Sequence, residues 1–382
     1  MGLQRGHRAH PLEWMVERLI FAVSLSTIAL LLLILVFIGR ETLPLLFGHT
    51  NSALIQEVIP ASEMDRLPTE ELRRYLDMTP SQFRSMDRDT LLAIMKTREE
   101  AEAEIPGPFR QDPDARVNTL GWRYLLLPHA WTGYDQPEFV WQPVGTIHKY
   151  NIVPLLVGSL KVTLIGLLFA VPVSLGAALF VSQLAPPRLR EWAKPAIELL
   201  AGIPSVVMGV FALLVLASLM QRLFGYQYRL NAFVAGIALG LTAVPLIFSI
   251  AEDALSSVPR GYTEAALALG ASRWQTASRI VLPAALPGVF AAVVLGFGRC
   301  IGETMVVLMV SGNASTLSWS LFDSTRSITA TIAAEMAEAV TGGPHYQLLF
   351  LLGTLLFVVT FVTNLAGDLV VHRLKARLEG TA

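Results

Sequence analysis

Long apolar runs alternate with shorter polar connections along most of this chain. A helix needs roughly 20 mainly apolar residues to cross the hydrocarbon core of a bilayer. Runs of that length without any charge are Leu19 to Ile38, Val162 to Val181, Leu199 to Met220, Ala232 to Ala251 and Leu348 to Gly367. A sixth run, Ala284 to Met309, is equally apolar but contains Arg299 and Glu303. The pattern predicts an all-α polytopic membrane protein with six transmembrane helices.

A hydrophilic stretch, 40–151, separates the first run from the second and is far longer than an ordinary connection. Thr69 and the pair Thr79-Pro80 are each expected to start a helix, because threonine caps helix N-termini and proline suits the first turn. Asp89 to Glu104 is expected to form a further helix. We therefore predict a small helical insertion outside the cytoplasm at about 53–104, with a mobile linker as the alternative.

Aromatic residues cluster between this insertion and the second apolar run. They are Trp122, Trp131, Tyr134 and Trp141. Aromatic rings beside a membrane span commonly lie at the level of the lipid headgroups. We expect these four side chains to be interfacial anchors.

Composition and charge place the chain in the membrane and give it an orientation. Hydrophobic residues make up 53% of the chain and charged residues 15%, against about 25% charged in soluble domains. The net charge of -1 lacks the basic excess typical of nucleic-acid binding. Because of the long apolar runs, membrane lipid is the expected surrounding partner. With the N-terminus inside, twelve Lys and Arg residues fall in cytoplasmic segments and three in short outer loops. Both termini are therefore expected in the cytoplasm.

This topology divides the chain into three parts. Residues 1–39 form the N-terminus and first span, 40–151 a long periplasmic loop, and 152–382 a core with five spans. The chain has no Gly-Lys dipeptide, so it lacks the G-x-x-x-x-G-K-[ST] loop that cradles nucleotide phosphates. If ATP drives this protein, ATP and magnesium bind to another chain. We expect no enzymatic activity, cofactor or metal site in this one.

The loop between the fourth and fifth runs, 252–283, carries a motif with long-range spacing. Glu264-Ala265-Ala266 is followed after three residues by Gly270, after nine more by Ile280, and after one more by Leu282-Pro283. Tyr262 to Leu269 is expected to form a helix, Gly270 a turn, and Ser272 to Val281 a second helix ended by Pro283. Two short helices joined at a glycine would make a compact knob on the cytoplasmic face.

This spacing resembles the signature of ABC importer permeases at every position. The resemblance implies that the knob fits a groove on a separate ATP-binding subunit and transmits its closure to the spans. Glu264 would then make the polar contact with that subunit, and Gly270 would form the turn.

The two charges in the sixth run form a candidate substrate site. Arg299 and Glu303 are four residues apart, which on a continuous helix places them on one face, one turn apart. Charged residues in hydrocarbon usually pair or line a water-filled path. A structural ion pair is one interpretation. In the other, the guanidinium binds two oxygens of a phosphate-like anion, which competes with Glu303 for Arg299.

Several further runs are similar to the PstC-type permeases of phosphate importers, over about 150–382. They are Ala170 to Ser174, Ile197 to Ser205, Gly298 to Met305, Val310 to Asn313 and Glu335 to Ala339. The resemblance implies a MetI-like permease fold in the bacterial inner membrane and a phosphate path lined by Arg299, Glu303, Thr304 and Ser205. Pro204-Ser205 interrupts the third run, and either a proline kink or a break that exposes backbone amides to an anion fits this position.

The same resemblance implies three kinds of partner. They are a second, PstA-like permease, a dimeric PstB-like ATPase and a periplasmic, PstS-like phosphate-binding protein. Two features depart from the family: Cys300, and the insertion from Ala53 to Glu104. The alternatives to phosphate import are a permease for sulfate or molybdate, a phosphate-sensing membrane component of the same complex, and a passive channel.

Overall fold

The computed structural model describes residues 11–46, 61–66, 69–76, 78–103, 117–145 and 147–378. Helices long and apolar enough to cross a membrane are Arg18–Leu43, Val153–Leu184, Ser205–Phe224, Ala232–Ser256 and Pro344–Leu374. A sixth span is obtained if the pair Arg273–Ala284 and Leu286–Gly302, which is bent by 72°, is counted as one. The predicted all-α polytopic architecture is therefore confirmed, with one of its spans broken.

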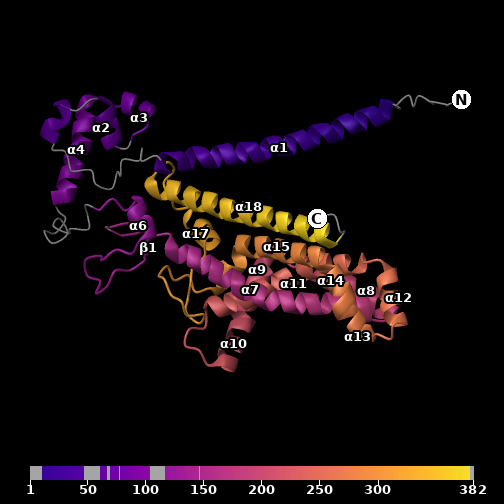
Figure 1. Ribbon diagram of the computed structural model, residues 1–382. Helices are drawn as coiled ribbons and strands as arrows, with labels where there is room; N and C mark the ends of the chain where they lie inside the picture. The colour runs from indigo at the N-terminus through magenta and orange to yellow at the C-terminus, as the bar shows by residue number, and fades with distance from the viewer. Residues whose placement is uncertain are drawn as a thin grey trace.

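The principal helices lie side by side along the long axis of the molecule (Figure 1). They are α1 (Pro11–Leu46), α7 (Val153–Leu179), α11 (Ala232–Ser256), α15 (Leu286–Gly302) and α18 (Pro344–Leu378). A π-helical segment, η4 (Phe180–Leu184), extends α7. Helix α11 packs against both α7 and α15, while α18 packs against α15 and α1. The first helix extends beyond the predicted boundary at residue 39 and ends at Leu46.

Glycines allow the two central helices to approach closely. A Cβ atom at Gly240 of α11 would lie 2.7 Å from the carbonyl oxygen of Gly166 of α7, so no larger residue fits there. Around this contact lies an apolar core that includes Leu239, Ile247 and Phe248. Because small residues bring the backbones together, α7 and α11 form the closely packed centre of the core.

The third span begins later than predicted. Helix α8 (Pro187–Leu200) is followed by a break, and the span starts at α9 (Ser205–Phe211), continuing through the π-helical η5 (Ala212–Leu216) and α10 (Ala217–Phe224). Pro204 is the N-cap of α9. The residue before a proline is disfavoured in helical conformation, so the break falls at this position and Leu199 belongs to the preceding helix.

The described part of the outer insertion is a small helical subdomain. It contains η2 (Ala61–Arg66), α2 (Thr69–Tyr75), α3 (Pro80–Ser85) and α4 (Arg88–Ala103), and its apolar core includes Leu72, Tyr75 and Met95. Thr79 is an N-cap within a capping box, as predicted, whereas Thr69 is the first helical residue of α2. The predicted segments 53–60 and Glu104 lie outside the described residues.

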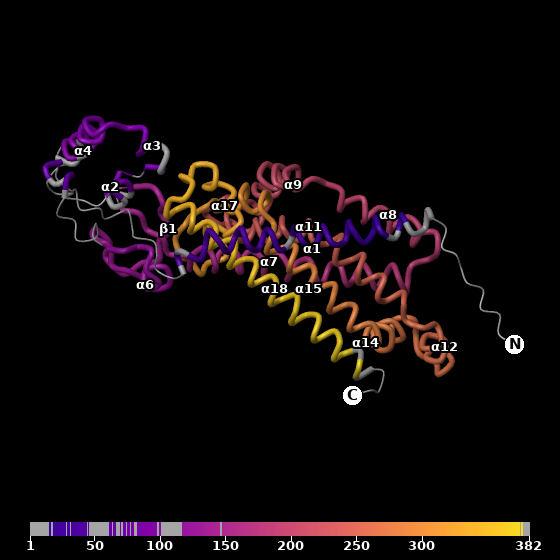
Figure 2. Tube along the Cα trace, turned by 90° about the horizontal axis from the view of Figure 1, so that it is seen from above, coloured from indigo at the N-terminus to yellow at the C-terminus, as the bar shows by residue number. Residues whose placement is uncertain are grey.

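This subdomain lies at one end of the molecule, and the loop with the long-range motif lies at the other (Figures 1 and 2). Short elements sit between the subdomain and the spans: α6 (Trp122–Leu126) and the antiparallel strands β1 (Trp141–Gln142) and β2 (Lys149–Tyr150). The prediction of aromatic anchors is wrong for Trp131 and Trp141, which are 5% and 0% exposed. Both side chains are buried in the segment 117–152, which contains α6, β1 and β2 and is called the outer cap below.

Candidate functional site: the coupling loop and the broken span

The motif loop folds into the predicted knob. Helix α12 (Arg260–Ala268) is followed by Gly270, whose φ of 87° is readily adopted only by glycine. Ser272 then starts α13 (Arg273–Thr276) with a capping box to Gln275. The next segments are the π-helical η6 (Ala277–Val281) and α14 (Leu282–Ala284).

Pro283 does not end the second helix of the knob, as the sequence pattern suggested. It lies in α14, which follows η6 directly through Val281 with helical backbone angles, so the helical path continues through the proline. The bend of 72° falls after Ala284 instead, immediately before α15. Leu282 and Pro283 therefore form a continuous helical link between the knob and the bend.

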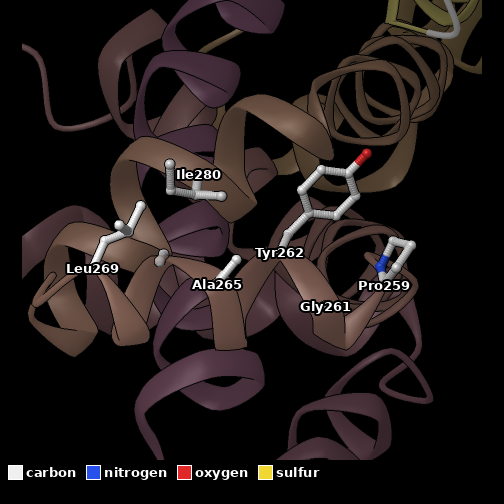
Figure 3. Close-up of a pocket in the computed structure, with 7 residues that line it drawn as sticks. Pro259, Gly261, Tyr262, Ala265, Leu269 and Ile280 are labelled. Atoms are coloured by element: carbon white, nitrogen blue, oxygen red, sulfur yellow. The ribbon is translucent and has the colours of Figure 1, made fainter.

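An apolar pocket of about 490 Å³ opens on one side of the knob (Figure 3). It is lined by Pro259, Gly261, Tyr262, Ala265, Ala266, Leu269 and Ile280. Leu269 is 90% exposed, and Tyr262 is also largely exposed. Such exposed apolar side chains around a hollow are typical of a protein-binding surface. The motif residues Ala265, Ala266 and Ile280 are thus brought together here.

Glu264 faces a different, polar pocket of about 330 Å³. Its lining includes Arg190, Arg260 and Thr263 together with Glu264. Helix α12 therefore separates two surfaces, with Ala265 and Ala266 on the apolar side and Glu264 on the polar side. A partner seated on the knob would meet both kinds of contact.

A buried carboxylate anchors the region next to the knob. Glu252, which is 1% exposed, accepts hydrogen bonds from Lys194 at 2.7 Å, from Arg190 at 3.1 Å and from Ser256 at 2.7 Å. Hydrogen bonds to Asp253 and Glu252 raise the pKa of the Lys194 ammonium above its usual value. This network ties α8 to the end of α11, and sequence reasoning missed it. The sequence feature that could have revealed the network is Glu252, an acidic residue directly after the apolar run Ala232 to Ala251.

The charged span is broken at its second charge. Helix α15 ends at Gly302, and Glu303 is its C-cap with extended backbone angles, φ -71° and ψ 129°. Thr304 is the N-cap of the next helix, α16 (Met305–Val310). The prediction of one continuous helix through both charges is therefore wrong: α15 ends at its C-cap Glu303, whose φ and amide hydrogen bond to the carbonyl oxygen of Cys300 still follow the helix.

The two charges do not form the predicted ion pair. Within the described part of the chain no salt bridge joins Arg299 to Glu303. Arg299 is exposed, while Glu303 and Thr304 are half-buried. The guanidinium thus projects from the last turn of α15, next to the break between α15 and α16.

Ser205 begins the helix that packs against α16. Helices α9 and α16 pack so closely that a Cβ atom at Gly209 would lie 2.7 Å from the sulfur of Met309 and 3.4 Å from the carbonyl oxygen of Met305. Ser205 is the first residue of α9, one turn before Gly209. The helix that starts at Ser205 is thus packed on the helix that follows the Glu303–Thr304 break.

The chain is similar to known membrane transport proteins. Residues 170–378 match the protein family described as the binding-protein-dependent transport system inner membrane component. The chain is 35% identical to the phosphate transport system permease protein PstC of Mesorhizobium japonicum, over 85% of this chain and 98% of that protein. It is 37% identical to the probable ABC transporter permease protein YqgH of Bacillus subtilis, over 58% of this chain and 72% of that protein.

A solved structure is also similar in outline. One chain of the inward-facing MetNI methionine ABC transporter aligns with a TM-score of 0.45 and 19% identity, over 58% of this chain and 96% of that chain.

Proposed function

This chain belongs to the family of binding-protein-dependent inner-membrane transport components, and within it to the PstC phosphate permeases; we propose that it forms one side of the path by which an ATP-driven importer carries inorganic phosphate. The observation that carries this proposal is the PstC relative, because it matches across 98% of its own length and not only over a shared motif. Sulfate and molybdate remain the competing substrates.

Three partners are proposed, and the two surfaces of the knob are the contact site of one of them, the ATPase. A dimeric, PstB-like ATPase binds ATP and magnesium and takes the apolar pocket around Leu269 as its contact, with Glu264 at the polar margin. A PstA-like permease completes the path, and a PstS-like protein delivers phosphate on the side of the outer subdomain. This arrangement requires the knob and both termini to be cytoplasmic, as the Lys and Arg distribution predicts.

In the proposed mechanism, the knob moves when the ATPase closes on nucleotide. Because α14 leads directly into the bend before α15, this motion changes the angle of α15 and the position of Arg299 at its far end. The guanidinium offers a planar set of donors matched to two oxygens of a phosphate. Thr304 and Ser205 would supply further hydroxyl contacts from the break and from α9.

Uptake measurements test the proposal. Cells that lack their own phosphate importer would be complemented with this chain and its partner subunits, and uptake of labelled phosphate, sulfate and molybdate would be compared. We expect ATP-dependent accumulation of phosphate that the other two oxyanions do not displace. Accumulation of sulfate or molybdate in preference to phosphate would overturn the substrate assignment, and flux without ATP would indicate a passive channel.

A further inference from the structure

Two charges of opposite sign lie one turn apart at the end of α15. Glu303 keeps a helical φ of -71°, and its amide donates to the carbonyl oxygen of Cys300 at 3.2 Å, so its side chain leaves the backbone about one turn from Arg299. In the part of the chain that the structure describes, neither side chain makes a salt bridge or a side-chain hydrogen bond. A guanidinium donor and a carboxylate acceptor are thus both open to a ligand.

The backbone of Glu303 is held on both sides. Its amide is bonded to Cys300, and its carbonyl oxygen accepts a hydrogen bond from the Thr329 hydroxyl at 2.9 Å. Thr329 belongs to α17 (Ile328–Glu335) and is itself buried. Because both polar groups of the Glu303 backbone already have partners, the half-buried side chain is the part of this residue that is left for a ligand.

The competing oxyanions differ in their protons. At neutral pH phosphate carries at least one proton, whereas sulfate and molybdate carry none. A guanidinium can donate to two oxygens of any of these anions, so Arg299 alone does not separate them. A carboxylate can only accept, so it forms a hydrogen bond with the hydroxyl of a protonated phosphate but meets only negative oxygens on sulfate. Sites that hydrogen-bond a hydroxyl of the substrate reject analogues that lack it.

We propose that Glu303 is a specificity-determining residue that selects a proton-bearing oxyanion, phosphate or arsenate, over sulfate and molybdate. Arg299 holds two oxygens of the anion, and the Glu303 carboxylate accepts a hydrogen bond from the hydroxyl of a third. No covalent bond is made or broken, and the proton stays on the ligand. With an unprotonated anion the carboxylate and the ligand repel each other, and this repulsion is stronger at a half-buried position than in bulk water. The inference rests on the proposed role of Arg299 in phosphate transport.

Protection of Arg299 from chemical labelling tests this selection without transport. Phenylglyoxal, a guanidine-selective reagent, labels the assembled membrane complex without its binding protein, and mass spectrometry follows the peptide that contains Arg299, with the exposed Arg222 as internal reference. In the wild type, phosphate and arsenate should protect Arg299 at concentrations about tenfold lower than sulfate, the effect of one charge-assisted hydrogen bond. The ratio compares two anions on one protein, so differences in folding or in the reactivity of Arg299 cancel.

Three variants separate this role from a merely structural one. Glu303→Gln offers an amide that donates as well as accepts, so phosphate and sulfate should protect Arg299 at concentrations within about twofold of each other. Glu303→Asp keeps a carboxylate and should still favour phosphate. Glu191→Gln, which removes an exposed carboxylate of α8, should keep the full wild-type ratio.

The outcomes distinguish this inference from the proposed function. An undiminished preference for phosphate in Glu303→Gln, or equal protection by phosphate and sulfate in the wild type, would overturn the inference and leave phosphate import standing. If neither anion protects Arg299 in the wild type, both the inference and the role of Arg299 are refuted. The expected protection without phosphate uptake by the wild type would refute the proposed function alone.

Discussion

The indole nitrogen of Trp141 donates a hydrogen bond of 3.0 Å to the carboxylate of Glu335, across 194 positions of sequence. Arg326 donates to the same carboxylate at 2.6 Å, and His345 lies 3.4 Å from it. Burial raises the pKa of Glu335, and the charge of Arg326 opposes that shift. This contact fastens the segment before the second span to α17 (Ile328–Glu335), whose Thr329 hydroxyl donates to the carbonyl oxygen of Glu303 at 2.9 Å.

Removing the indole donor should weaken the outer cap. Trp141→Phe retains an aromatic ring but leaves the buried carboxylate without one partner, which costs about 1 to 3 kcal/mol. Thermal unfolding of the purified complex should shift to lower temperature. Trp122→Phe is the matched control, because Trp122 is 46% exposed, and it should have no such effect. Equal melting temperatures for both variants would contradict the role of the hydrogen bond.

Acidification should loosen the same region through His148. Burial lowers the pKa of His148 below its ordinary value of 6.5, so the folded state favours the neutral ring. The resulting stability is present above pH 6.5 and is lost as the pH falls through the lowered folded-state pKa. Thermal stability of the complex should therefore fall from pH 7.5 to lower pH, and His148→Gln should make that decline shallower. An identical decline in the variant would exclude His148 as a contributor.

Local signals in the sequence predicted the parts of the fold that depend on neighbouring residues. Thr79 with Pro80 marked a helix start, and Gly270 marked a turn that needs a positive φ. Apolar runs located the spans, since helix length is set by bilayer thickness. These features could be predicted because each is decided within a few residues.

Features that depend on distant contacts could not be predicted. Trp141 was expected at the lipid interface, but its partner Glu335 lies far away in sequence and draws it into the core. Spacing alone suggested one helix through Glu303, whereas α15 ends there and the carbonyl oxygen of Glu303 accepts a hydrogen bond from Thr329. The candidate residues were therefore accessible from the sequence, but their relative geometry was not.

The apolar pocket on the knob should be required for ATPase binding. Leu269→Ser removes its most exposed lining side chain and should weaken association about tenfold, as for burial of one leucine at an interface. Leu267→Ser is the control, because Leu267 is an exposed leucine of α12, two residues before Leu269, and does not line the pocket. Co-purification of the ATPase with each variant measures the effect. Equal losses for both leucines would indicate general damage to the loop.

The central claim is that Arg299 handles the transported anion, and uptake by the reconstituted complex tests it most directly. Proteoliposomes with the permease subunits and the ATPase, supplied with the binding protein, would be assayed for labelled phosphate uptake with Arg299→Gln and with Arg222→Gln, an exposed arginine outside the broken span. Losing a charged, bidentate contact should reduce uptake about a hundredfold or more in Arg299→Gln, while the ATPase still co-purifies. Arg222→Gln should transport normally. Near-normal uptake by a fully assembled Arg299→Gln complex would contradict the account.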